Sequence, residues 1–149
     1  GRLASAPIVL LLSLVQVVIF CSMAWYGELS PCGLHGWGSV WGPVVLGDKY
    51  RLVTGMFLHS HWVYLVADVG LQMALGPAQE RDSGSLCFLA LYLATGSVSN
   101  CVFASLHPGV PPTGAAGSVV GIVAARVGYY WLAQIARKQW RVAGVLAVC

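Results

Sequence analysis

The chain has 149 residues, of which 58% are hydrophobic and only 9% are charged, and its formal net charge is +3. A soluble domain carries roughly 25% charged residues, so this composition excludes an ordinary soluble protein and predicts an all-helical, multi-span membrane protein. The small positive charge reflects where Lys and Arg lie relative to a bilayer and gives no indication of a nucleic-acid partner.

No metal or cofactor motif is visible. The cysteines are scattered singly, without the paired spacing of a zinc site, and most lie in apolar runs where cysteine behaves as a small hydrophobic residue. They are Cys21, Cys32, Cys87, Cys101 and Cys149. We therefore expect no cofactor.

The N-terminal half of the chain predicts two spans separated by a long loop. Residues 8–26 hold no charge, follow a Pro that suits a first helical turn, and are long enough to cross a bilayer. A loop rich in Gly, Pro and Trp follows over residues 27–55, a composition typical of a functional or membrane-embedded segment. Residues 57–76 predict the second span, with a helix that begins near Ser60 or His61 and that Pro77 ends, before a polar turn at 79–82.

The C-terminal half predicts two further spans and the start of another. Residues 86–105 form the third span, 107–112 a rigid Pro-rich connection, and 115–134 the fourth span. A basic turn at 137–141 then leads into a fifth span that opens at Val142. The predicted spans place five basic residues on one side of the membrane and two on the other. This imbalance predicts an N-terminus on the cytoplasm-like side and the long loop on the opposite side.

The segment at the start of the fourth span carries the clearest motif. Residues 113–121 read TGAAGSVVG, and such small residues let two helix backbones approach closely. Together with motifs upstream, this segment resembles the rhomboid intramembrane proteases. The resemblance covers about residues 50–131, and we expect residues 1–149 to form a single domain. The motifs are residues 50–54 (YRLVT), 57–59 (FLH), Gly76 with Glu80 and Gly84, residues 92–96 (YLATG), and Gly114, Gly117 and Gly121.

The resemblance implies a helical bundle with a half-membrane cavity that opens toward the long loop. In active members a serine on the fourth helix attacks the peptide bond, a histidine on the sixth helix takes its proton, and an H-x-x-x-N pair on the second helix helps stabilise the oxyanion. Here Ala116 occupies the serine position, Tyr64 the histidine position and Asp68 the asparagine position, and a sixth helix would lie beyond Cys149. No catalytic group is intact, because alanine has no nucleophile and an ionised carboxylate repels a developing oxyanion.

Other polar residues nearby have structural interpretations. Ser118 lies two residues beyond Ala116, which turns it away from the cavity on a helix. His59 is expected to make a structural hydrogen bond, and His61 does not share its face.

Two charged residues lie inside predicted spans, where they are by default functional or paired. Asp68 is expected to face the positive N-terminal end of the fourth helix. Arg126 lies about three turns below Ala116 and therefore at a different depth from Asp68, so we do not expect Asp68 and Arg126 to pair. Two roles stay open for Arg126: it snorkels toward the cytoplasm-like side, or it meets a partner subunit. Together with Gly114, Gly117 and Gly121 it is a candidate helix-packing or partner contact.

These residues predict an inactive rhomboid-like membrane protein that acts by binding. Two versions stay open: a client-binding regulator and a structural subunit of a membrane complex. The expected partners are the lipid bilayer and the transmembrane helices of clients or neighbouring subunits, with the mitochondrial inner membrane and endomembranes as candidate locations. The alternative is an active rhomboid protease captured as a Ser→Ala form, which does not account for Tyr64 or Asp68.

Overall fold

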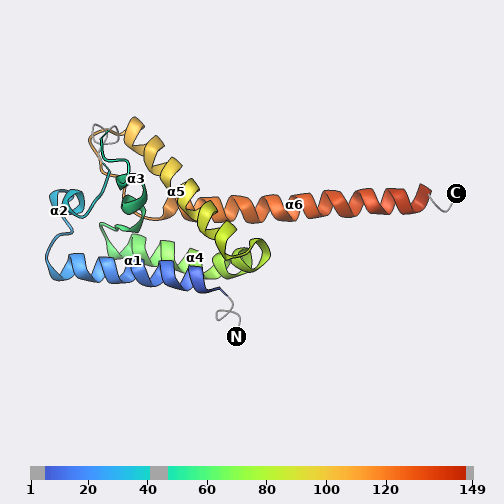
Figure 1. Ribbon diagram of the computed structural model, residues 1–149, viewed down its shortest axis with the longest axis horizontal. Coiled ribbons are helices and arrows are strands. Elements are labelled where there is room, and N and C mark those ends of the chain that lie inside the picture. Colours follow the sequence, from blue (N-terminus) through green and yellow to red (C-terminus); the bar gives the residue numbers. More distant parts are fainter. Residues whose placement is uncertain (1–5, 41–46, 147–149) are drawn as a thin grey trace.

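The structure, a computed structural model, is a helical bundle (Figure 1). It describes residues 6–40 and 47–146, with side chains as far as residue 135. Within these residues all regular secondary structure is helical, which confirms the predicted fold class. The elements are α1 (Pro7–Trp25), α2 (Pro31–Gly36), α3 (Arg51–Thr54), the short 3₁₀ helix η2 (Gly55–Phe57), α4 (Trp62–Ser83), α5 (Ser85–Leu106) and α6 (Ala116–Leu146).

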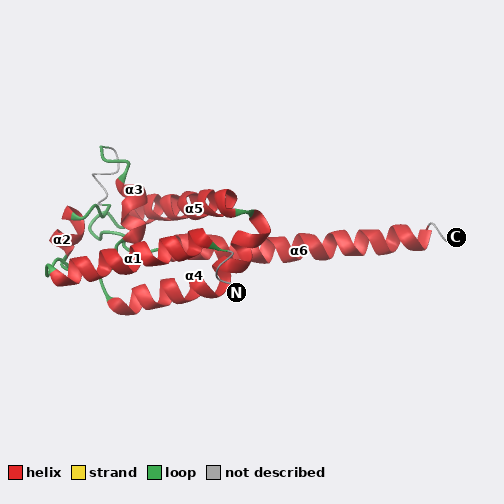
Figure 2. Ribbon diagram, turned by 60° about the horizontal axis from the view of Figure 1, so that its bottom comes forward, coloured by secondary structure: helices red, strands yellow, loops and turns green. Residues whose placement is uncertain are grey.

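Four long helices form the bundle. α1, α4, α5 and the first part of α6 lie alongside one another, while α2, α3 and η2 cover the end where α1 finishes (Figures 1 and 2). We call this the loop end, and we call the opposite end, where α4 turns into α5, the turn end. α6 continues well past the turn end (Figure 1).

Three of the described helices are long and apolar enough to cross a membrane: α1, α5 and residues 116–135 of α6. They correspond to the predicted first, third and fourth spans. α4 lies outside this set, since polar and charged side chains such as Asp68, Gln72 and Glu80 interrupt its apolar sequence. The predicted count of about five spans is therefore only partly visible in the described residues.

The core is apolar and is packed closely enough to need glycine. Its main cluster joins α1, η2, α5 and α6 through buried side chains that include Val9, Met56, Phe88, Tyr92 and Ile122. A Cβ atom built at Gly76 would lie 2.8 Å from Cγ2 of Val9, so α4 and α1 make contact where glycine leaves space. Such close approach between helix backbones is typical of membrane bundles.

The prediction that Pro77 ends the second span was wrong. α4 runs through Pro77 to Ser83, and the predicted polar turn at 79–82 is its last helical turn. Proline removes one hydrogen bond from a helix interior, but a tertiary contact holds the turn that follows. The buried Glu80 carboxylate accepts hydrogen bonds from the backbone N–H groups of Ile8 and Val9 at 3.1 and 2.9 Å. The helix ends instead at Gly84, whose φ of +83° glycine adopts readily.

The predicted basic turn at 137–141, with a new span opening at Val142, was also wrong. The backbone of α6 stays helical from Ala116 to Leu146 through both positions. No proline lies in this stretch, and neighbouring residues such as Ala136, Lys138 and Gln139 are good helix formers. A change from apolar to basic composition therefore does not by itself end a helix.

The predicted long loop contains α2 and α3 and is fastened to the bundle. Arg51 Nη1 donates to the carbonyl oxygens of His35 and Ser39 at 2.7 and 3.2 Å, and Thr54 Oγ1 donates to the Gly38 carbonyl oxygen at 2.7 Å. Ser39 Oγ in turn donates to the carbonyl oxygen of Pro112 at 3.0 Å. The loop is thus a folded cover over one end of the bundle. Trp41 and Gly42, which contributed to the loop prediction, lie outside the described residues.

Candidate functional site

A cavity of about 530 Å³ lies between α4, α5 and the start of α6, toward the loop end. Its walls combine apolar side chains with hydroxyl and amide groups, and none of the lining residues is charged. The lining residues are Pro31, Leu34, Ser60, Tyr64, Ser99, Asn100, Phe103, Val110, Pro111, Pro112, Thr113, Gly114, Ala116 and Gly117. Two of the three predicted catalytic positions, Tyr64 and Ala116, are therefore brought together at one cavity.

The chain enters α6 through a turn that requires glycine. Gly114 has a φ of +100°, a conformation in which other residues are strained. This turn leads through buried Ala115 into the helix, so that Ala116 begins α6 at the cavity wall. The first amides of a helix carry partial positive charge. A hydroxyl or carbonyl oxygen placed here would be polarised, but the methyl group of Ala116 has no such chemistry.

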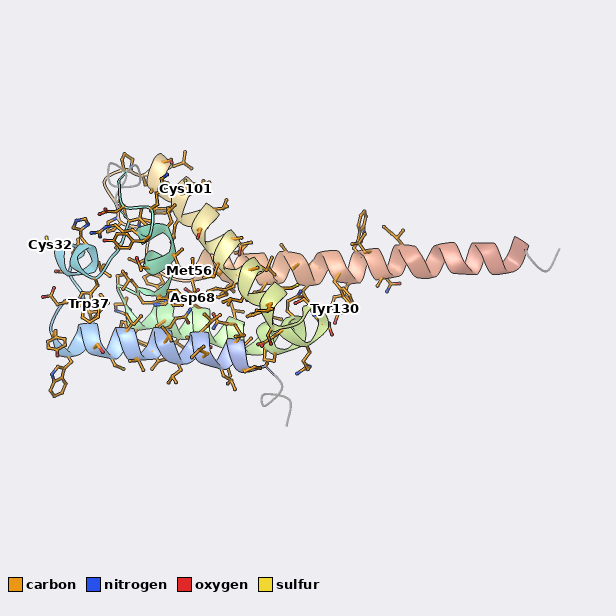
Figure 3. The ribbon with its side chains drawn as sticks, in the orientation of Figure 1. Cys32, Trp37, Met56, Asp68, Cys101 and Tyr130 are labelled. Carbon is orange, nitrogen blue, oxygen red and sulfur yellow. The ribbon has the colours of Figure 1, made fainter. Side chains whose placement is uncertain are left out.

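Asp68 lies against that helix start, near the middle of the bundle (Figure 3). Its Oδ2 atom accepts a hydrogen bond from the Ala115 backbone N–H at 2.8 Å and lies 3.2 Å from Nε2 of His59. Since a carboxylate can only accept, the His59 Nε2–H donates to it. The negative charge of Asp68 is thus held by a helix N-terminus and a buried histidine. This is the placement that the sequence suggested for Asp68.

His59 makes the structural hydrogen bond expected of it and is fully buried. Its other ring nitrogen, Nδ1, has no hydrogen-bond partner among the described residues. His61 has a separate role, because its Nδ1 accepts from the Val63 backbone N–H at 3.2 Å and caps the start of α4. Within the described residues no group of three His, Cys, Asp or Glu side chains lies close enough to hold a metal ion.

Tyr64 and Ser118 flank the site differently. Tyr64 is one helical turn before Asp68 on α4, and its exposed ring lines the cavity. Ser118 points away from the cavity, as predicted, and its buried Oγ donates to the Tyr92 carbonyl oxygen at 2.8 Å. Ser118 is therefore a contact between α5 and α6.

The glycines of α6 lie where that helix meets α5. A Cβ at Gly117 would overlap the side chain of Ser99, and one at Gly121 would overlap that of Thr95. A second hollow of about 550 Å³ follows the same α5–α6 seam and shares Ser99, Ala116 and Gly117 with the first. The cavity at Ala116 thus borders a groove that small residues line along α5 and α6.

Arg126 lies far from Asp68 and has another partner. Its Nη1 pairs with Oδ2 of Asp82 in the last turn of α4, and its Nη2 donates to Tyr130 Oη at 3.1 Å. Arg126 therefore belongs to the turn end of the bundle, and the two charges in the spans do not pair with each other.

Two polar features were missed by the sequence reasoning. Asn100 lines the cavity and fastens the loop, since its Nδ2 donates to the Leu52 carbonyl oxygen at 2.9 Å. Within the bundle, Gln16 Nε2 donates to Tyr92 Oη at 2.6 Å, and Gln72 Nε2 donates to Ser13 Oγ at 2.8 Å. The available signal was the presence of amide side chains inside apolar segments, where each needs a partner.

Comparison with known proteins identifies the family of the chain. The Rhomboid domain family model matches residues 46–148, which is more than half of the chain. No solved structure gives a significant match.

Three curated relatives also match. The chain is 31% identical over 97 residues to Rhomboid-like protease 5 of Toxoplasma gondii, covering 63% of this chain and 11% of that protein. It is 32% identical over 82 residues to RHOMBOID-like protein 9, chloroplastic, of Arabidopsis thaliana, covering 55% and 19% of the two chains. It is 34% identical over 85 residues to Rhomboid protease GluP of Bacillus subtilis, covering 55% and 16%. The chain thus spans less than a fifth of the length of each of these relatives, and it belongs to the rhomboid family of integral membrane proteins.

Proposed function

We propose that this protein is a catalytically inactive rhomboid that acts by binding transmembrane helices of other proteins. One observation carries the proposal: the side chain at the start of α6, in the wall of the cavity, is the methyl group of Ala116. No acyl intermediate forms on a methyl group, because covalent catalysis requires a nucleophilic oxygen, sulfur or nitrogen.

The electrostatics beside Ala116 support the same conclusion. Oxyanion stabilisation requires hydrogen-bond donors directed at developing negative charge. In this site the Asp68 carboxylate already accepts from the Ala115 amide at 2.8 Å and brings its own negative charge to the helix start. A serine alone at position 116 would therefore meet an unfavourable field.

The binding function rests on what the site retains. The cavity is uncharged and partly apolar, and it shares wall residues with the groove along α5 and α6. Small exposed residues of the groove such as Ala94 and Ala124 permit close approach of a helix backbone, and hydroxyl groups such as that of Ser99 offer hydrogen bonds within a bilayer. A transmembrane helix fits both features.

Two biological versions follow, a client-binding regulator and a structural subunit of a membrane complex. The native mass of the protein, extracted gently from its own membrane, separates them. A defined assembly of fixed stoichiometry indicates a subunit, whereas a monomer or small variable complex indicates a regulator.

The second candidate function is intramembrane proteolysis, with Ala116 replacing a serine. The names of two relatives, Rhomboid-like protease 5 and Rhomboid protease GluP, favour it. It leaves the departures at Tyr64 and Asp68 unexplained.

Restoring the missing group tests inactivity. We expect Ala116→Ser in the full-length protein to leave a generic rhomboid substrate uncleaved in liposomes, because Asp68 still opposes an oxyanion. The triple change Ala116→Ser, Tyr64→His and Asp68→Asn is the matched comparison, and thermal unfolding of each variant checks the fold. Cleavage by the single Ala116→Ser variant would overturn the proposal and favour the protease.

A further inference from the structure

The cavity at the start of α6 holds more hydrogen-bonding groups than the protein itself uses. Four side-chain hydroxyls line it, and none of the four makes a hydrogen bond to another described residue. They belong to Ser60, Tyr64, Ser99 and Thr113. By contrast, Thr95 and Ser105, which lie on the same helix as Ser99, each donate at 2.8 Å to a carbonyl oxygen one turn back. The hydroxyls of the cavity are therefore available to a ligand.

Asn100 adds an acceptor whose orientation is fixed. Only 5% of its surface is exposed, and it lines the cavity. Its Nδ2 atom donates to the Leu52 carbonyl oxygen at 2.9 Å, which determines the branch of the amide that carries the oxygen. Within the part of the chain that the structure describes, its Oδ1 atom accepts no hydrogen bond. Because an unpaired buried amide oxygen is unfavourable, the cavity favours a ligand with an N–H or O–H group.

The charges around the cavity select a neutral ligand. None of the described residues that line it is charged. The Asp68 carboxylate lies behind the wall at Gly114, where a Cβ atom would be 3.0 Å from Asp68 Oδ2. Since this carboxylate already has His59 and the Ala115 amide as partners, it does not require a cation. A phosphate in the cavity would meet a negative charge and no base, which excludes an anionic headgroup.

The position of the cavity indicates a lipid. The cavity lies toward the loop end, where exposed aromatic side chains of the kind found at membrane–water interfaces gather: Trp25, Tyr26, Trp37, Tyr50 and Trp62. The wall that it shares with the groove consists of small residues, Ser99, Ala116 and Gly117. On the other side of this wall the groove presents exposed Val98 and Val120. A polar cavity at headgroup depth therefore has apolar surface for a hydrocarbon chain beside it.

We propose that the cavity binds the headgroup of a neutral glycerolipid with free hydroxyl groups, such as a monoacylglycerol, whose acyl chain lies along the groove of α5 and α6. A headgroup hydroxyl donates to Asn100 Oδ1, and the hydroxyls of Ser99 and Tyr64 bond to its other oxygens. The cavity volume of about 530 Å³ is typical of small-molecule sites. Such a lipid regulates the entry of a client helix, and this regulation rests on the proposed function, whereas lipid binding itself requires no client.

Photo-crosslinking tests the ligand. The full chain is reconstituted in phosphatidylcholine nanodiscs with a monoacylglycerol that carries a diazirine on its acyl chain, and the labelled residues are mapped by mass spectrometry. We expect labels on the groove side of α5 and α6, and competition by unlabelled monoacylglycerol. Its dimethyl ether retains the oxygens but has no O–H for Asn100, so it should compete about tenfold less well. Phosphatidic acid should not compete, because it is charged.

Removal of cavity hydroxyls tests the site. The Tyr64→Phe, Ser99→Ala variant deletes two of the proposed hydrogen bonds, and at about fivefold for each bond its affinity should fall about 25-fold. Tyr26→Phe with Ser105→Ala is the matched control, since neither residue lines the cavity or the groove. This control should be labelled like the wild type, and thermal unfolding checks that both variants are folded.

The outcomes separate this proposal from the proposed function. Equal competition by the ether, full labelling of the Tyr64→Phe, Ser99→Ala variant, or labels confined to helices other than α5 and α6 would each overturn the lipid site. No client is present in these measurements, so such a failure leaves helix binding intact. Conversely, a native mass without any bound protein, together with labelling as expected, would support the lipid site and count against helix binding.

Discussion

The two halves of α4 differ in how they follow the rhomboid pattern. The cavity half, residues 62–72, has Tyr64 and Asp68 where the resemblance implies a histidine and an asparagine. The turn half, residues 73–83, has Gly76 and Glu80 where the resemblance implies those same residues. Both halves belong to one continuous helix, so the difference lies in what each half does.

Each half has its own physical task. In the turn half, Gly76 admits Val9 of α1, and Glu80 supplies the N-terminal amides of α1 with acceptors that its own N-cap residue, Ala6, lacks. In the cavity half, Asp68 holds the start of α6 with a carboxylate. The turn half thus holds the start of α1 with residues of the rhomboid pattern, whereas the cavity half holds the start of α6 with a residue that departs from it.

Removal of Glu80 should produce the largest effect. Glu80→Ala leaves the amides of Ile8 and Val9 and the hydroxyl of Ser85 without their acceptor in a buried site. Hydrogen bonds to charged groups contribute about 1.5–3 kcal/mol each, so we expect a loss of about 3 kcal/mol or more in the free energy of unfolding. Unfolding in mixed detergent micelles measures it.

Glu80→Gln is the matched control, because its amide retains one acceptor oxygen. It should lose about half as much stability as the alanine variant. If both variants unfold like the wild type, α1 does not depend on α4 for its cap, and the contrast between the two halves disappears.

A methyl group on the turn half should produce the next largest effect. In Gly76→Ala the new Cβ lies 2.8 Å from Val9 Cγ2 and 3.6 Å from Phe88 Cζ. Overpacking of this kind costs about 1–3 kcal/mol. Gly70→Ala on the same helix is the control, since no atom lies within 4 Å of its Cβ position, and it should be neutral or stabilising by up to about 1 kcal/mol. Equal thermal stability of the two variants would show that the turn half is not closely packed.

The difference between the halves also explains which features the sequence could predict. Apolar length was sufficient for α1, α5 and the first 20 residues of α6, because bilayer thickness sets that length. The rhomboid resemblance was sufficient to assign Tyr64 and Ala116 to one site, and both line the cavity. The predicted ends of α4 and α6 were wrong because the true ends depend on distant contacts or on helix continuity. Glu80 binds α1, 71 residues away, and no proline follows Gln134.

The cavity walls were harder to predict for a related reason. Asn100 and Pro112 contact residues of the loop, Leu52 and Ser39, that are far away in the chain. A single polar residue in an apolar segment shows that a partner exists but not where it lies. The partner of Arg126 illustrates this: the sequence left open a snorkelling role or another subunit, and the structure has Asp82 in that place.

Neutralisation of Asp68 should produce the smallest effect. Asp68→Asn retains a carbonyl oxygen that accepts from the Ala115 amide, so we expect the free energy of unfolding to change by less than about 1 kcal/mol. Asp68→Ala removes the acceptor and leaves two buried donors unpaired, the Ala115 amide and the His59 Nε2–H, which should cost about 1–3 kcal/mol each. Unfolding of the pair in the same micelles separates the hydrogen bond from the charge. A loss in Asp68→Asn as large as that in Asp68→Ala would mean that the negative charge itself stabilises the start of α6, and that the cavity half is as constrained as the turn half, though by a different side chain.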